Sequence, residues 1–394
     1  HKAMKRIISF LIILSAWVTA RSATDSISPR NTFGDWAVEA GVAGSRILPT
    51  NNLLKTVDGN EAMIAPDIRA GFSFRRHSRY GRLYPGVRQG IGLTLFNIVP
   101  HSSLGRPVGL YLFQTVRIAG NNRLALEGEW NFGVSAGWSK YDPDAPIVNN
   151  AIGSKVNAML GVGLSGVWRI SSHWGLKATV NAMHFSNGNT HLPNAGVNTA
   201  GLMLGARYYI SPVEDVTRLP ADKDTFRRGF SYDVTAYGAW RCRVVGDGMG
   251  GNVIAPGSFA VAGVNFAAMY DLNRYFRGGL SLDMQYDESA NLDRHHADGS
   301  YGDHVKFYRQ PFADCFAAGL SLRAELTLPI FSINVGLGRN IIANGPDTRI
   351  FYQTLALKAH VWRNAFIQVG YQLSEFHLPN NLMFGLGYTF GRLK

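Results

Sequence analysis

Apolar and polar residues alternate with a period of two along most of this chain. From residue 33 onward, nearly every segment places apolar side chains on one face and polar side chains on the other. This is the pattern of a β-strand with one apolar face. The segments run about 12 to 16 residues, whereas strands of soluble sheets usually have ~5 to 6. Strands of this length are long enough to cross a bilayer at a tilt.

Composition excludes several other classes of protein. Charged residues make up 17% of the chain and aromatic residues 12%, which is too few charges and too many aromatics for a disordered chain. Beyond the N-terminus no run of 18 apolar residues occurs, so helical membrane spans are not expected. Two cysteines are too few for a disulfide scaffold, and whether Cys242 pairs with Cys315 stays open. The mean hydropathy of -0.04 is that of strands with one lipid-facing and one polar face.

The N-terminus predicts export. Basic Lys5 and Arg6 precede an apolar run, and small residues end at Ala20, so we expect residues 1–20 to be a cleaved signal peptide. Its removal leaves 36 basic residues against 27 acidic ones, a net charge of +9. The sign of this charge alone suits nucleic acid as well as phosphorylated lipid headgroups. For an exported, membrane-embedded protein we expect the lipid as partner and no nucleic acid.

The connections between segments alternate in length. Short ones fall near 119–122, 170–173, 271–275, 327–330 and 361–365, and long polar ones near 47–66, 140–153, 187–195, 244–254 and 287–311. Short periplasmic turns and long extracellular loops are typical of outer-membrane barrels. We therefore expect an all-β fold, a transmembrane antiparallel outer-membrane β-barrel of roughly 14–16 strands over residues 21–394, in the bacterial outer membrane. The last strand ends in Phe390 and resembles the C-terminal insertion signal of that class. A soluble sandwich or propeller is the alternative, with shorter strands.

One long connection breaks the alternation. Residues 211–229 lie on the predicted periplasmic side, where turns are otherwise short. A connection of this length could join two half-size barrels, so this arrangement stays open beside a single large barrel. The tetrapeptide His-Leu-Pro-Asn occurs at 191–194 and again at 377–380, each time before a strand. This recurrence indicates a possible internal duplication around 211–229.

Three patterns resemble catalytic or metal sites without their structural setting. The Gly-x-Ser-x-Gly of 133–137 and the Gly-x-Gly-x-x-Gly of 161–166 both fall within predicted strands, where neither a nucleophile elbow nor a dinucleotide fold can form. The loop containing Asp293, His295, His296, Asp298, Asp303 and His304 matches no known metal-ligand spacing. We therefore expect a solvated loop, no metal and no cofactor.

A polar interruption of one apolar face is more informative. In the strand of residues 173–186 the alternation places His184 and Ser186 on the lipid face, and in the next strand it places Asn198 there. Polar groups are costly in that position unless they serve a purpose. A serine nucleophile, a histidine base and an amide that orients the ring make up a hydrolase triad. The N–H groups of Asn187 and Gly188 are the candidate oxyanion hole.

These residues resemble a known family. His184-Phe-Ser186-Asn187-Gly188, followed by Pro193-Asn194-Ala-Gly196, is similar to the signature of the lipid A 3-O-deacylases, the outer-membrane barrels often called PagL. The resemblance implies that His184 and Ser186 are catalytic and that the 3-position acyl chain of lipid A, in the lipopolysaccharide of the outer leaflet, is removed. The family has a glutamate twelve residues after the serine, where this chain has Asn198, and its barrel is about half as large.

A second family resembles the same residues. The outer-membrane phospholipase A barrel uses a Ser-His-Asn triad, and its His-x-Ser-Asn-Gly motif is similar to residues 184–188, with an asparagine at the position of Asn198. Three hypotheses therefore stay open: a lipid A deacylase, a phospholipase A, and a non-catalytic porin or structural barrel with a polar cluster at its rim.

Overall fold

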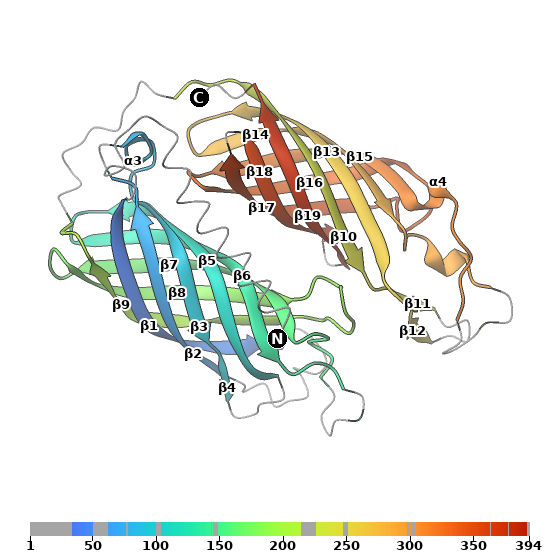
Figure 1. Cartoon of the computed structure of the whole chain (residues 1–394), viewed down its shortest axis with the longest axis horizontal. Helices are drawn as coiled ribbons and strands as arrows, with labels where there is room; N and C mark the ends of the chain where they lie inside the picture. Colours follow the sequence, from blue (N-terminus) through green and yellow to red (C-terminus); the bar gives the residue numbers. More distant parts are fainter. Residues whose placement is uncertain are drawn as a thin grey trace. The chain divides into compact units, whose positions relative to one another are not determined.

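The structure is a computed structural model and describes residues 34–49, 62–75, 78–99, 104–142, 144, 149–213, 226–246, 251–297, 300, 305–362, 364–376 and 378–391. The predicted signal peptide of residues 1–20 lies outside the described residues, as do residues 214–225 of the long connection. The chain divides into two compact units: most of residues 26–223 form one, and residues 224–394 belong to the other. Each unit is a β-barrel (Figure 1).

The first barrel closes through its first strand, because β1 pairs with both β2 and β9. All of its pairings are antiparallel, and β3 and β4 act as one interrupted strand beside β2. The elements are β1 (Asp35–Leu48), β2 (Ala62–Ser73), α3 (Arg79–Leu83), β3 (Val87–Leu95), β4 (Asn97–Val99), β5 (Gly105–Gly120), β6 (Leu124–Trp138), β7 (Val156–Arg169), β8 (Trp174–Ser186) and β9 (Val197–Tyr209).

The second barrel closes through β10, which pairs with both β13 and β19. A small hairpin of β11 and β12 and two short helical segments lie in its connections. The elements are β10 (Phe230–Arg241), β11 (Val244–Gly246), β12 (Asn252–Ile254), β13 (Phe259–Asp271), β14 (Phe276–Asp287), η4 (Leu292–Arg294), α4 (Phe312–Cys315), β15 (Phe316–Thr327), β16 (Phe331–Ala343), β17 (Phe351–Trp362), β18 (Ala365–Ser374) and β19 (Leu378–Phe390).

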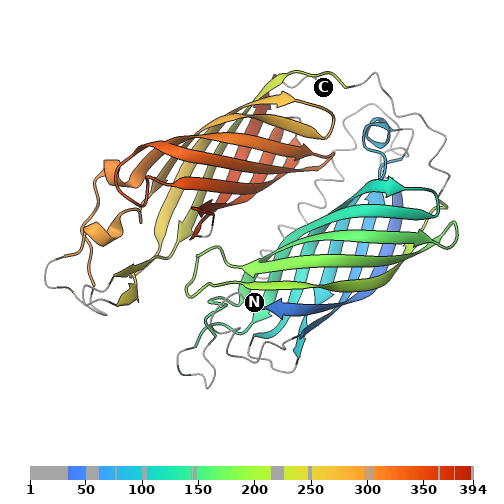
Figure 2. The ribbon, with the colours of Figure 1, turned by 180° about the vertical axis from the view of Figure 1, so that it is seen from behind.

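The predicted all-β, antiparallel barrel fold is confirmed. Of the two arrangements that the sequence left open, the structure has two closed barrels of eight strands rather than one of sixteen (Figure 2). In the first barrel, two connections at one end are short, after β5 and after β7, and the long ones between β1 and β2, β6 and β7, and β8 and β9 are at the other. We call these the turn end and the loop end. In the described part of the chain, no helix has both the length and the apolar character of a membrane-spanning helix.

Both barrels have apolar outer walls and polar interiors, the reverse of a soluble protein. In the first barrel, Arg69, Lys177 and Arg207 point inward and are buried, and they form ion pairs with Asp67, Glu39, Glu127 and Glu129 at 2.5–3.1 Å. In the second, Arg277 and Lys358 bridge Asp233 and Glu325 at 2.7–3.1 Å, and Arg323 contacts Asp283 at 2.7 Å. Buried charges need such partners, and here they fill the lumen.

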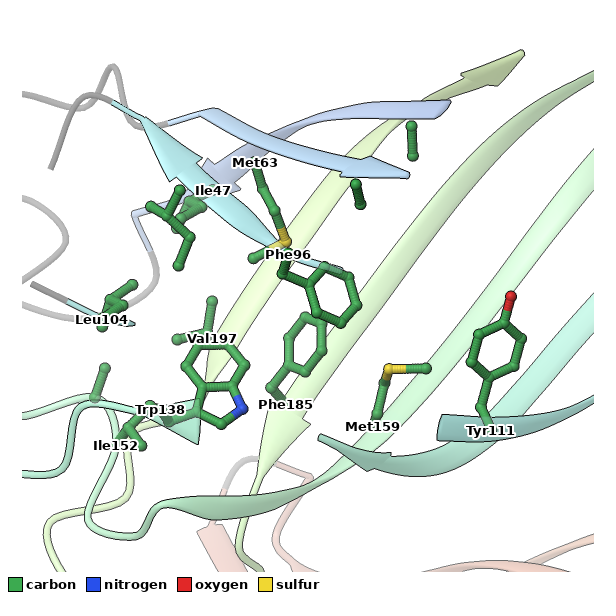
Figure 3. Close-up of a cluster of buried hydrophobic side chains, with 14 of the residues drawn as sticks. Ile47, Met63, Phe96, Leu104, Tyr111, Trp138, Ile152, Met159, Phe185 and Val197 are labelled. Carbon is green, nitrogen blue, oxygen red and sulfur yellow. The ribbon is translucent and has the colours of Figure 1, made fainter. Parts of the chain in front are cut away.

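The loop end of the first barrel has a different interior. Buried apolar side chains gather there beneath the ends of β8 and β9, among them Phe185 and Val197, each 0% exposed. Phe185 packs edge-on against Phe96, with ring centroids 5.1 Å apart, and against Trp138 at 5.0 Å (Figure 3). Side chains packed this closely leave few voids and are hard to compress. The wall at the ends of β8 and β9 therefore has a rigid apolar support behind it.

Candidate active site

His184 and Ser186 lie on the outer wall of the first barrel, at the loop end of β8. Along this strand Lys177 and Thr179 are buried in the lumen, and Phe185 is buried in the apolar cluster. Because side chains alternate across a strand, His184 and Ser186 project outward on either side of Phe185, and both are half-buried. The predicted outward placement of this pair is confirmed.

Asn198 projects from the same wall on the neighbouring strand. It lies between buried Val197 and Thr199 on β9 and is the direct cross-strand partner of His184. His184 Nδ1 and Asn198 Oδ1 are 2.7 Å apart. Because an amide oxygen only accepts hydrogen bonds, this contact requires the proton on Nδ1 and leaves Nε2 as the basic nitrogen of the neutral ring.

The hydroxyl of Ser186 has a partner that the sequence did not predict. Asn194 Nδ2 donates to Ser186 Oγ at 2.9 Å, and the Oδ1 of the same amide accepts the N–H of Asn187 at 3.1 Å. From the sequence Asn194 was only a residue of the motif, and the N–H of Asn187 was a candidate oxyanion donor. In the structure that N–H is engaged by Asn194, and the side-chain amide of Asn194 is the donor beside Ser186.

The connection of residues 187–196 is held in shape by its own side chains. The buried side chain of Asn187 donates from Nδ2 to His191 O at 3.0 Å and accepts His191 N at 3.4 Å. Gly188 adopts a left-handed φ of 64°, which glycine reaches without strain. Pro193 is half-buried in the same connection. Asn187 thus shapes the loop that brings Asn194 to Ser186.

Gly196 supports the ring of His184. Its φ is 76°, and a Cβ added there would lie 3.0 Å from His184 Cε1 and 3.1 Å from Phe185 O. Its N–H donates to Ala151 O at 3.0 Å, and Ala151 is itself fully buried. The absence of a side chain at residue 196 therefore lets the backbone approach the imidazole closely.

Where the structure describes it, the second barrel has no such cluster at the topologically equivalent place. The repeated His-Leu-Pro-Asn falls between the seventh and eighth strands of the first barrel. In the second barrel Leu378, Pro379 and Asn380 are the first residues of the eighth strand, β19, and His377 lies outside the described residues. The outward positions of β18, and those of β19 from Leu382 to Phe390, carry only apolar and aromatic side chains. Of these two equivalent strand pairs, only β8 and β9 thus present the reactive residue types on the outer wall.

The remaining sequence patterns lie in two strands and in the connection between β14 and β15. Residues 133–137 and 161–166 lie within β6 and β7, as expected. His295 Nε2 lies 3.0 Å from Asp314 Oδ2, whereas Asp298, Asp303 and His304 are outside the described residues. Within the described ranges, no three His, Cys, Asp or Glu side chains gather to hold a metal. Cys242 and Cys315 are free thiols, and burial raises the pKa of both.

Two family models match the chain, one within the first barrel and one over the second. Residues 113–207, which include β6 to β8 and all but the last two residues of β9, match the family described as lipid A 3-O-deacylase (PagL). Residues 230–392, which contain the second barrel, match the family described as acyloxyacyl hydrolase, C-terminal domain. Together the two matches cover more than half of the chain. No curated protein matches the sequence.

Solved structures of membrane barrels are similar to this chain only distantly. Neisserial surface protein A is 14% identical, with 44% of this chain and 96% of that chain covered, at a TM-score of 0.32. An outer-membrane channel from Pseudomonas putida F1 is 10% identical, with 93% and 100% covered, at a TM-score of 0.23. It is the two family matches that place the sequence: the chain belongs to the PagL-like family of lipid A 3-O-deacylases and acyloxyacyl hydrolases.

Proposed function

We propose that this protein is an outer-membrane serine esterase that removes an ester-linked acyl chain from lipid A. Ser186 is the nucleophile, His184 the general base and Asn198 the residue that orients the imidazole. The observation that carries the proposal is the 2.7 Å contact between His184 and Asn198, on the outward wall of β8 and β9, with Ser186 two residues along the same face. The family match over these strands supports the same chemistry.

The reaction follows from the chemistry of these groups. His184 Nε2 takes the hydroxyl proton as Ser186 Oγ attacks the ester carbonyl. The resulting imidazolium keeps its Nδ1 proton, and that N–H donates a hydrogen bond to Asn198 Oδ1. The tetrahedral intermediate collapses, the C–O bond to the lipid breaks, and the leaving alkoxide takes the proton from Nε2. Water, deprotonated by His184, then releases the fatty acid from Ser186.

The developing oxyanion needs donors close to Ser186. Asn194 Nδ2 is 2.9 Å from Ser186 Oγ and is the side-chain donor that we assign to this task. The backbone N–H of Gly188 is a further candidate, whereas the N–H of Asn187 would have to exchange its bond to Asn194. Removing one oxyanion donor typically lowers kcat about 10²- to 10³-fold.

The location of the site fits a lipid substrate. The outward faces of β7, β8, β9 and β1 are apolar apart from positions near the loop end. We take the loop end as extracellular, because long loops face outward in outer-membrane barrels. The three side chains then lie at the level of the outer leaflet, where lipid A resides. The substrate reaches them laterally from the membrane, and we expect no cofactor.

Phospholipid hydrolysis is the second candidate function, and one observation favours it. The orienting residue Asn198 is an amide, as in the Ser-His-Asn triad of the outer-membrane phospholipase A, rather than the glutamate of the deacylases. The two substrates share the ester and differ in backbone, so a direct comparison separates them.

Hydrolysis by the purified protein tests both functions. The protein in detergent micelles is incubated with lipid A or with phosphatidylethanolamine, and products are identified by mass spectrometry. We expect loss of one acyl chain from lipid A, no lysophospholipid, and no product with Ser186→Ala. Lysophospholipid as the main product would make the protein a phospholipase, and the absence of any product would contradict both functions.

A further inference from the structure

Among the described residues, Arg46 is the one charged side chain on the outer wall around the candidate active site. The outward positions of β2, β1, β9, β8 and β7 carry apolar residues with four exceptions: Arg46, His184, Ser186 and Asn198. All four lie toward the loop end of their strands. A guanidinium on a lipid-facing wall is costly unless it serves a purpose there.

The strand register places Arg46 beside the triad. Arg46 pairs with Ala200 on β9, two residues from Asn198, and Ala200 in turn pairs with Ala182 on β8, two residues from His184. Diagonal neighbours of this kind on one face are about 7–8 Å apart. Arg46 is therefore one strand from Asn198 and two strands, about 10 Å, from β8. Its long side chain is exposed and can reach toward headgroups at the loop end.

Asn198 makes this arrangement different from one with an acidic orienting residue. A carboxylate at position 198 would lie diagonally across from Arg46 and attract its guanidinium. The amide of Asn198 carries no charge, so the triad itself adds no negative charge that would compete with an anionic ligand. A guanidinium presents a planar fork of donors that matches a phosphate bidentately.

We propose that Arg46 binds a phosphate group on the sugar backbone of the lipid substrate and so positions the neighbouring acyl ester at Ser186. The proposal rests on the proposed function, because it names the feature by which the same site selects its substrate. It makes Arg46 a specificity-determining residue for phosphorylated glycolipids, and it predicts that the phosphate, not the acyl chain alone, places the ester.

The test compares substrates with and without the phosphate. Wild type, Arg46→Gln and Arg46→Lys are assayed in micelles with bisphosphorylated lipid A, with enzymatically dephosphorylated lipid A and with phosphatidylglycerol. We expect Arg46→Gln to lower kcat/KM for bisphosphorylated lipid A about 10- to 100-fold, mainly through KM, since a hydrogen bond to a charged group is lost. On the same substrate, the kcat/KM of Arg46→Lys should lie between those of wild type and Arg46→Gln. On dephosphorylated lipid A the three proteins should agree within about twofold.

Two controls accompany this test. One shows whether the effect is specific to Arg46 rather than common to exposed arginines of the barrel, and the other tests phosphate binding even if the proposed esterase activity is absent. Arg123→Gln, an exposed substitution at the turn end of the first barrel, should change neither substrate's kinetics. Equal loss on both forms of lipid A, or no loss on either, would overturn the proposal, and a loss confined to phosphatidylglycerol would assign Arg46 to phospholipids instead. Binding of both lipid A forms to Ser186→Ala, with and without Arg46→Gln, distinguishes the same outcomes even if no hydrolysis occurs.

Discussion

His184 and Asn198 are direct cross-strand partners in β8 and β9, and the imidazole Nδ1 lies 2.7 Å from the amide Oδ1. The pair stands on an apolar outer wall with a packed apolar cluster behind it. Ser186, on the same face of β8, accepts a hydrogen bond from Asn194. A base with a defined tautomer and a hydroxyl with a nearby donor are therefore presented on the outer wall rather than to the lumen.

Asn198 should matter through its oxygen atom. Asn198→Ala removes the acceptor for His184 Nδ1, and we expect kcat to fall by at least about tenfold, the equivalent of one hydrogen bond. Asn198→Asp keeps an oxygen in the same place and should retain more activity than the alanine variant. Steady-state kinetics on lipid A measure both. If the alanine variant matches wild type, Asn198 does not orient the ring.

Asn194 should matter through its donor. Asn194→Asp preserves size and the oxygen that accepts Asn187 N–H but removes the N–H₂ group beside Ser186. Loss of an oxyanion donor predicts a drop in kcat of about 10²- to 10³-fold with little change in KM. Asn150→Asp, at an exposed position of the connection before β7, is the matched control and should leave kcat unchanged. If Asn194→Asp and Asn150→Asp have equal kcat, Asn194 is not the oxyanion donor.

Gly196 should tolerate no side chain. Gly196→Ala brings a Cβ within 3.0 Å of His184 Cε1 and imposes a left-handed φ on alanine, a backbone cost of about 1–3 kcal/mol. Activity should fall. The unfolding temperature should fall too, measured as the temperature at which the band of the folded barrel on a gel is replaced by that of the unfolded chain. Gly166→Ala on β7 is the control, because nothing lies within 4 Å of its added Cβ. Similar behaviour of the two variants would contradict a positioning role for Gly196.

The lumens should conduct no ions. Ion pairs fill the interior of both barrels, and the first is also closed by the apolar cluster at its loop end. Reconstitution in planar bilayers should give no single-channel currents, whereas a porin treated in the same way gives them. Steady channels of uniform size would favour the porin hypothesis and would show that these interiors open.

Much of this arrangement could be predicted from periodicity. A strict period of two predicts the outward placement of His184, Ser186 and Asn198, since each lies in a regular strand. The closure of two barrels could not be predicted, because it depends on long-range pairing of β1 with β9 and of β10 with β19, for which local alternation carries no signal. The contact of Asn194 with Ser186 was also missed, because residues 187–196 form an irregular connection without periodicity.

The most direct test of the proposed esterase is the acylation of lipid A in cells. Lipid A is extracted from bacteria that express wild type or Ser186→Ala at equal levels in the outer membrane, and its mass is measured. We expect wild-type cells to contain lipid A lighter by one ester-linked acyl chain and Ser186→Ala cells to contain the unmodified form. Identical, fully acylated lipid A in both would contradict the proposed function, as would equal loss of the chain in both.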